Sequence, residues 1–396
     1  MSDVDVNPVE LVLQGAIETG QVFEGIELLL PREVPLGGPR AMPVLRSLPN
    51  KYRHFIGAWC FADHYGPVDL EAAHGMDVQP HPHTGLQTVS WLIRGDVVHR
   101  DSIGSVSRIA PGAVNLMTAG RGISHSEVSP DAGDRDPLLH GVQLWVALPE
   151  AVRDRAPAFA SAGGAELPTV VLEHAGAGGS GIVATVFLGE YFGQAAPGET
   201  HTPIVGAELR FTSCSDALLP LEARFEHGIL ACSPGIRVDD VELPVGTIGY
   251  LPAGRERVAI SAGDDGIAIL LGGEPFDEEI VMFWNFVGSS HDEVRAAREE
   301  WQAEIEADLT SAARPRFGVV EGHGRTVIPA PELPTVPLRP RGRVREQREQ
   351  EEGAAGAARP TGDGGRASEP GAGASGQGSR SAAAEPRPGD PPASSA

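Results

Sequence analysis

The chain has 396 residues, of which 41% are hydrophobic, and this length is enough for two domains with cores of their own. Its formal net charge of −23 repels nucleic-acid phosphates, and no basic stripe offsets that repulsion, so direct nucleic-acid binding is disfavoured. No run approaches about 18 apolar residues, and the start of the chain lacks the apolar core of a signal peptide. Neither membrane insertion nor secretion is therefore expected.

The three cysteines, Cys60, Cys214 and Cys232, are an odd number at wide spacings, and no Cys-x-x-Cys pair occurs. They are expected to be reduced thiols, because cytosolic proteins seldom keep disulfides. Together with the missing leader and spanning segments, this cysteine usage predicts a cytoplasmic protein.

The first 150 residues are expected to contain one β domain. Residues 1–18 are predicted to be an extended lead-in, and the domain itself is assigned to residues 19–150. Between residues 79 and 127, short β-branched and aromatic runs are broken by Gly and Pro, which is typical of a meander of short strands. The high counts of 50 Gly and 34 Pro also favour many short strands joined by tight turns.

Two short segments at the ends of this meander contain candidate metal ligands. Because side chains alternate along a strand, His81 and His83 point the same way, and so do His125 and Glu127. Three imidazoles and one carboxylate suit a borderline divalent transition metal, and they leave two positions of an octahedral ion open for chemistry. A chance His-x-His among the 13 histidines is the alternative. The second pair, brought back by turns, favours the metal site.

The second half of the chain is predicted to form another β domain over residues 151–290, after a linker or short helix. Several short apolar runs within it are typical of strands. No His-x-His occurs here, and His174, His201 and His227 are scattered. This domain is therefore predicted to lack a metal, with its histidines packed structurally.

A change of pattern marks the end of the predicted barrels. Residues 291–333 are assigned to a helix and a closing segment, and the helix is expected over residues 292–309. Its apolar stripe, made by Val294, Ala297, Trp301 and Ile305, is expected to pack against a barrel. Residues 334–396 are rich in Pro, Gly, Ala, Arg, Glu and Ser, and are predicted to be a disordered tail.

Several segments of the chain resemble the pirin family. These are HPHTGLQTVSWLIRGDVVHRDSIG at 81–104, APGAVNLMTAGRGISHSE at 110–127, and the stretches 55–67 and 139–149. Pirins are bicupins, so the resemblance implies two tandem cupin domains, which are jelly-roll β-barrels. With the helix and the tail predicted above, the expected fold is all-β with a short C-terminal helix and a disordered tail. The resemblance also implies that Fe2+, or another divalent transition metal, is held by four residues of the N-terminal barrel. Position by position these are His81, His83, His125 and Glu127.

The resemblance is broken just beyond the first pair of ligands. The family usually has His-Pro-His-Arg-Gly-Phe-Glu, whereas this chain has Thr84, Leu86 and Gln87. The charges beside the ligands are therefore gone, and substrate preference does not carry over. An amide is a poor ligand beside a carboxylate, so Gln87 is predicted to support the ligands and not to bind the metal.

Three further histidines lie near the two ligand pairs in the sequence. His64, His74 and His99 are predicted to be surface or hydrogen-bonded histidines and not ligands.

The resemblance leaves the function between two classes. Bacterial pirins are described as quercetin 2,3-dioxygenases, which implies a small aromatic, flavonol-like substrate and dioxygen. It also implies that the enolic proton is taken by Glu127, as catalytic residue, or by metal-bound water. Eukaryotic pirins are described as transcriptional cofactors, which implies instead a metal-dependent regulatory binding protein with a protein partner and no turnover. A scaffold that only keeps its metal is a third interpretation, and the four intact ligands favour the first two.

Overall fold

The computed structural model describes residues 20–342, except 37–41, 71–74, 132, 134–135, 173–180, 213–214, 308–314 and 324–325. The expected lead-in at 1–18 lies outside the described residues. Nearly all the regular structure is antiparallel strand, which confirms the predicted all-β class. No helix within the described ranges is both long enough and apolar enough to cross a membrane.

The first barrel is built from two sheets. The larger contains β3 (Arg32–Leu36), β4 (Met42–Leu48), β5 (Trp59–Asp69), β7 (Leu86–Arg94), β10 (Ala113–Thr118), β12 (Leu138–Ala147) and β13 (Ala158–Gly163). Their order is β13-β10-β7-β12-β5-β4-β3. The smaller contains β6 (Asp77–His83), β8 (Val97–Asp101), β9 (Val106–Ile109) and β11 (Ile123–Val128), in the order β6-β11-β8-β9.

The second barrel repeats this plan. Its larger sheet contains β1 (Val22–Phe23), β2 (Ile26–Leu29), β14 (Thr169–Leu172), β15 (Ile182–Tyr191), β16 (Gln194–Ala195), β17 (Ile204–Phe211), β19 (Glu226–Ala231), β22 (Ile248–Leu251) and β24 (Ile267–Gly273). The order is β1-β2-β22-β19-β24-β17-β15-β14, with β16 beside β15. The smaller sheet contains β18 (Ser215–Pro220), β20 (Arg237–Val238), β21 (Val241–Glu242) and β23 (Arg257–Ala262), in the order β18-β23-β20-β21.

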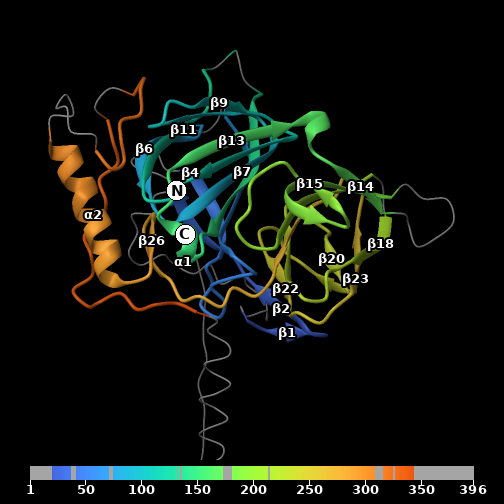
Figure 1. Cartoon of the computed structure of the whole chain (residues 1–396). Helices are drawn as coiled ribbons and strands as arrows, with labels where there is room; N and C mark the ends of the chain where they lie inside the picture. Colours follow the sequence, from blue (N-terminus) through green and yellow to red (C-terminus); the bar gives the residue numbers. More distant parts are fainter. Residues whose placement is uncertain are drawn as a thin grey trace, which may run out of the picture. The chain divides into compact units, whose positions relative to one another are not determined.

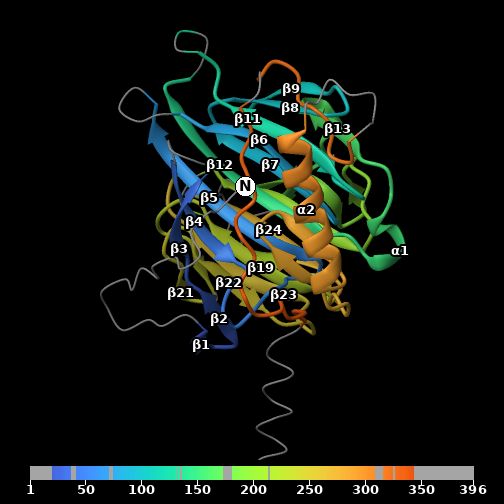
Figure 2. The same ribbon diagram turned by 90° about the vertical axis from the view of Figure 1, so that its left-hand side faces the viewer.

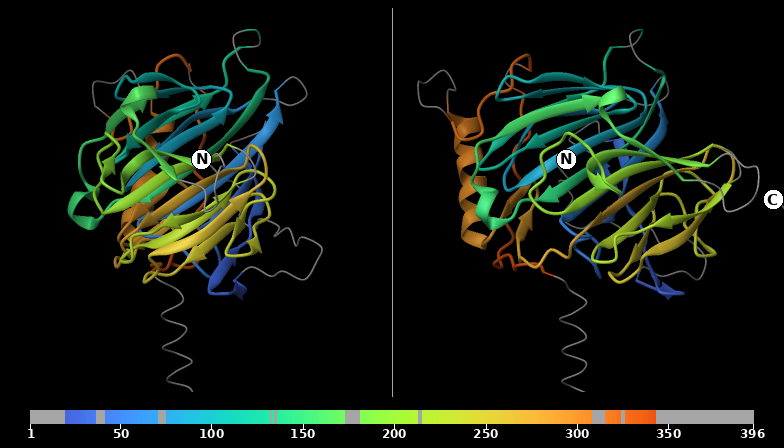
Figure 3. Two further views of the ribbon diagram at one scale, coloured as in Figure 1. Left: turned by 90° about the vertical axis from the view of Figure 1, so that its right-hand side faces the viewer. Right: turned by 45° about the vertical axis from the view of Figure 1, so that its right-hand side comes forward.

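Each barrel is completed by strands from the half of the chain assigned to the other. β2, from the start of the described chain, pairs with β22 of the second barrel, and β13, which follows the short helix α1 (Glu150–Arg153), pairs with β10 of the first. Figure 1 shows β2 in blue beside β22, and Figure 3 shows the green β13 among the strands of the first barrel. The sheets therefore do not follow the expected boundaries at 19–150 and 151–290, because both barrels are completed by this exchange.

Two buried tryptophans of the first barrel join it to the second. Trp59 Nε1 lies 3.2 Å from the carbonyl oxygens of both Val205 and Gly272. Trp91 Nε1 donates to Glu208 Oε2 at 2.9 Å, and its ring stacks on Phe187 with centroids 5.0 Å apart. The indole N–H groups thus find acceptors across the interface, which lets both large rings be buried without an unsatisfied donor.

The expected helix is present as α2, His291–Glu306, and Ser290 caps it by accepting a hydrogen bond from the Glu293 backbone N–H. Val294, Ala297 and Trp301 are buried, as the stripe predicted. They pack on the hairpin of β25 (Val281–Phe283) and β26 (Phe286–Gly288). Figures 1 and 2 show α2 beside the first barrel near β6.

The tail was predicted to begin at residue 334, which is too early. Residues 334–342 are described, and Arg341 exchanges two backbone hydrogen bonds with Ile280, at 2.7 and 3.1 Å. The Leu338 backbone N–H also donates to Nδ1 of His291 at 3.1 Å. Composition missed this contact because it is made mostly by backbone groups, which the side-chain content of a segment does not reveal. Residues 343–396 lie outside the described residues.

Deleting residues 334–396 is therefore expected to lower the thermal midpoint by roughly 2–4 °C, the shift that loss of about 1 kcal/mol causes in a domain of this size. Deleting only 343–396 is expected to leave the midpoint unchanged, because that composition offers little apolar surface to bury. Calorimetry on the two truncated proteins and the full chain checks this, and equal midpoints for the two truncations would contradict it.

Candidate metal centre

The two predicted ligand pairs lie on neighbouring strands of the smaller sheet of the first barrel. In the antiparallel register of β6 and β11, His125 is opposite His81 and Ile123 is opposite His83. The register then shifts, so that Glu127 is opposite Val78 and β6 carries one extra residue. A bulge of this kind redirects side chains, and bulges are common beside functional sites.

Three histidines form a compact, buried group. Ring centroids are 5.0 Å apart for His81 and His83, 4.4 Å for His81 and His125, and 4.9 Å for His83 and His125. Each residue offers a nitrogen within 4.8 Å of the others. All three side chains are at most 1% exposed. The structure therefore brings together the three histidines that the sequence singled out.

Burial leaves several polar atoms of this group without partners. His81 Nδ1 lies 2.9 Å from the Gln79 carbonyl oxygen, so with the proton on Nδ1 the lone pair is on Nε2. Nε2 of His81, Nε2 of His125 and Oε2 of Glu127 have no hydrogen-bond partner. Desolvation holds the pKa of all three imidazoles well below its usual value, which keeps the rings in the neutral form that binds metals.

Glu127 joins the group through His125. His99, His125 and Glu127 form a second group that could hold a metal ion, and their ligand atoms also lie within 4.8 Å of one another. Ser90, on β7, donates to Glu127 Oε1 at 3.0 Å and leaves Oε2 free. The carboxylate is 1% exposed, and such an anion is costly to bury unless a cation or donors compensate it.

Two alternatives were predicted for His99, a surface residue or a hydrogen-bonded one, and the first is wrong. His99 is 2% exposed and lies opposite Glu127 in the pairing of β8 with β11. Its Nδ1 is 3.3 Å from His125 Nδ1, and its Nε2 is 3.2 Å from Asp101 Oδ2. The Asp101 Oδ1 atom accepts from two backbone N–H groups, those of Ile103 and Ser105. The other prediction, a hydrogen-bonded histidine, is confirmed.

This chain of contacts determines which nitrogen of His125 is free. In the tautomer that donates to Asp101 through Nε2, His99 accepts at Nδ1. His125 then donates through Nδ1, and its Nε2 lone pair points away from this pair. Partners behind a ligating histidine fix its tautomer and ring orientation in this way in many metal sites.

Replacing His99 by Phe is expected to weaken metal binding by about 10- to 100-fold, because His125 loses the acceptor that orients it. Asn, whose side-chain oxygen can replace Nδ1 as acceptor, is expected to restore most of the affinity. Competition titration of cobalt or zinc against a chromophoric chelator measures this. If His99 were only structural, both variants would lower the thermal midpoint of the metal-free protein and leave the affinity unchanged.

Gln87 does not take the supporting place predicted for it. It lies three residues from Ser90 on β7 and so faces the other side of the strand. Its Nε2 donates to Thr118 Oγ1 at 2.9 Å and to the Glu199 carbonyl oxygen at 3.1 Å. Ser90 contacts Glu127 instead, and the alternation along β7, counted from Trp91 at the barrel interface, would have identified it.

The segment after the second barrel covers the strand ends that carry the ligands. The backbone of Thr84 pairs with Asn285 and Val287 of the β25–β26 hairpin. Gly85 has φ +71°, and a Cβ there would lie 2.3 Å from the Val287 oxygen, so this close approach requires glycine. On the next strand, Ser124 N–H donates to the Phe317 oxygen at 3.0 Å. The segment after the second barrel thus packs against both strands that carry the ligands.

The donor set fits a divalent transition metal. It offers neutral imidazole nitrogens and one carboxylate, buried and partly without partners, which is the combination that such ions prefer. Two groups of ligands share His125. One contains His81 and His83, and the other contains His99 and Glu127.

The buried, paired positions of the corresponding strands in the second barrel carry no such donors. β18 and β23 occupy the places of β6 and β11 in the order of their sheet. Their paired residues are Ala217 with Ile260 and Leu219 with Val258, and all four are buried. Aliphatic side chains offer no ligand atoms, so these positions fill the barrel with apolar core.

Comparison with known proteins gives a consistent family. The Pirin profile matches residues 41–146, and the profile of the Pirin C-terminal cupin domain matches residues 207–305. A Pseudomonas aeruginosa protein named "Putative quercetin 2,3-dioxygenase" is 38% identical over 310 residues, 78% of this chain and 91% of that protein. A "Pirin-like protein" of Caulobacter vibrioides is 34% identical and covers 65% of this chain and 87% of its own length.

Among solved structures, the crystal structure of a quercetin 2,3-dioxygenase from Acinetobacter baumannii is similar, with a TM-score of 0.71 and 38% identity. The match covers 80% of this chain and 98% of that one. Together with the two matching profiles and the two cupin barrels, these relatives show that the chain belongs to the pirin family.

Proposed function

We propose that the protein is a mononuclear iron dioxygenase that acts on a flavonol-like aromatic substrate. The buried histidines His81, His83 and His125, with Glu127 grouped beside His125, carry the proposal, because these donors fit an Fe2+ ion and are costly to bury without one. Relatives with 38% identity carry the name quercetin 2,3-dioxygenase, and this supports the substrate class.

The three histidines and Glu127 would hold the ion. Bound there, iron would supply a Lewis-acidic and redox-active centre that is open to a substrate hydroxyl and to dioxygen. The Glu127 carboxylate, which accepts a hydrogen bond from Ser90 at Oε1, would receive the enolic proton of the substrate. Trp145, whose ring meets the His83 ring edge to face at 5.2 Å, would help to exclude water.

A phenol also lies near this carboxylate. Tyr65 is 2% exposed, and burial together with the charges of Glu127 and Asp63 holds its pKa well above its usual value. The Tyr65 hydroxyl is therefore protonated at neutral pH and is available as a donor close to the developing charge.

The test is to load the full chain with Fe2+ without oxygen, add quercetin, and admit air. Loss of the flavonol absorbance with uptake of one dioxygen and release of one carbon monoxide is expected. The variant with both His83→Ala and His125→Ala is the matched control. Retained iron without any turnover would reject the enzyme and favour the regulatory binding protein.

A further inference from the structure

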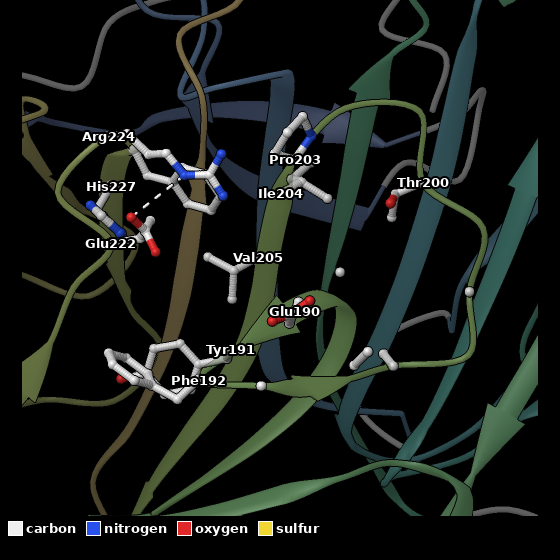
Figure 4. Close-up of a pocket in the computed structure, with 16 residues that line it drawn as sticks. Glu190, Tyr191, Phe192, Thr200, Pro203, Ile204, Val205, Glu222, Arg224 and His227 are labelled. Carbon is white, nitrogen blue, oxygen red and sulfur yellow. Dashed lines mark ion pairs between the residues drawn. The ribbon is translucent and has the colours of Figure 1, made fainter.

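The second barrel contains a cavity at one of its ends. Its volume is about 360 Å³, within the range of small-molecule sites. It is lined by the end of β15, the residues that follow β15, and the starts of β17 and β19. Figure 4 shows Val205 between Arg224 and Glu222 on one side and Tyr191 and Phe192 on another. None of the proposed metal ligands lines it.

Among the lining residues, His227 has a buried polar atom without a partner. Its side chain is 1% exposed, and Nδ1 has no hydrogen-bond partner. The ring lies 6.1 Å from that of Phe225, which also lines the cavity. Burial lowers the pKa of His227 to about 4, so at neutral pH the imidazole is uncharged and offers one donor and one acceptor. A buried polar atom without a partner is uncommon, and a ligand hydroxyl would satisfy it.

Aromatic rings form the walls. Tyr191 and Phe192 meet edge to face with centroids 4.7 Å apart. Phe192 is 55% exposed and has φ +48°, in a two-residue turn with Gly193 that favours Asn or Gly. A large apolar side chain in this conformation costs free energy and gains no burial. Unfavourable backbone conformations of this kind cluster at functional sites. Here the exposed Phe192 ring is placed to contact a ligand.

The charges lie at the rim and discriminate against anions. Glu190 and Glu222 are both exposed lining residues. Arg224 is already paired with Glu222 at 3.5 Å and Glu274 at 2.5 Å, so it adds no free positive charge. The carboxylates would accept hydrogen bonds from hydroxyl groups, and they would repel a carboxylate or phosphate.

We propose that this cavity is a second binding site, specific for a neutral hydroxylated aromatic molecule of the phenol class. The ring would stack on Phe192 and Tyr191, and its hydroxyl would bond to His227. The site is distinct from the metal centre and needs no metal, so it goes beyond the dioxygenase activity proposed above.

Calorimetric titration of the metal-free full chain with 2-naphthol tests the proposal. Binding is expected, and 2-methoxynaphthalene, which cannot donate, is expected to bind about fivefold more weakly, the scale of one neutral hydrogen bond. His227→Leu is expected to weaken 2-naphthol to a similar degree. The variant lacking His83 and His125 is expected to bind 2-naphthol like the parent, and loss of binding there would place the ligand at the metal centre and overturn the proposal.

Phe192→Gly gives an independent test that does not threaten folding, because glycine favours positive φ. It is expected to weaken 2-naphthol by about five- to tenfold, the scale of a lost aromatic contact. Val171→Ala, which shortens another exposed apolar side chain, is the matched control and is expected to change nothing. Equal affinity in Phe192→Gly and the parent would overturn the proposal, as would tighter binding of 2-naphthoate or of 2-naphthylmethylammonium.

Discussion

The variants His83→Ala and His125→Ala are each expected to reduce the bound metal from about one ion per chain to near zero. Each change removes one of the few protein ligands, and with it a large share of the metal-binding free energy. Elemental analysis of the purified proteins measures the loss. If the metal content of the double variant were unchanged, the ion would bind elsewhere.

Thermal melting separates loss of metal from loss of fold. For the parent, metal at 100 times its Kd is expected to add about 2.7 kcal/mol to the free energy of unfolding. In the variants this addition is expected to vanish. Metal-free His83→Ala is expected to melt close to the metal-free parent, because both nitrogens of the His83 ring are buried without a partner. His125→Ala also loses the contact with His99 and is expected to melt lower. His291→Ala, on α2 and away from the cluster, is the control that should keep the full metal-induced shift.

The second large effect is expected at Glu127. As the anionic member of the proposed ligand set, its carboxylate lowers the charge of a divalent site from +2 to +1 and favours the ferric state. Glu127→Gln keeps the shape and an oxygen that can accept from Ser90, but it removes the charge. We expect a folded protein that binds iron more weakly, has a higher iron reduction potential, and turns over substrate at least about tenfold more slowly.

Metal titration and redox titration of the two proteins side by side check this result. Glu208→Gln is the matched control, because Glu208 is also a buried carboxylate but bonds to Trp91 and Arg210 in the barrel interface. Affinity and potential both unchanged in Glu127→Gln would remove this residue from the ligands and leave a site of three histidines.

The sequence identified the histidine cluster because its information is local. His81 and His83 are two residues apart on a strand, and only the return of β11 had to be supplied by turns. His99 could not be assigned in the same way. Its role depends on lying opposite Glu127 in the pairing of β8 and β11, and a register between separate strands is not contained in the spacing of either one.

The predicted domain boundaries differ from the observed sheets for a similar physical reason. The strand that carries Leu28 is apolar and near the start, so it was assigned to the nearest barrel, but its backbone pairs with Gly249. Such long-range pairing is decided by which sheet edge is open once both barrels exist. The cavity beside His227 was also beyond the sequence, since Tyr191, Val205 and His227 line it from three different strands.

The exchanged strands also bear on how the chain is made. At about 5–20 residues per second, roughly 10 to 40 seconds of synthesis separate Leu28 from its partner Gly249. Throughout that interval the segment Ile26–Leu29 has been synthesised and can pair with β1, but its partner strand β22 does not yet exist. The nascent chain therefore carries a strand with an unpaired, aggregation-prone edge during most of its synthesis. The ribosome-bound protein is expected to depend on chaperones far more than the folded one.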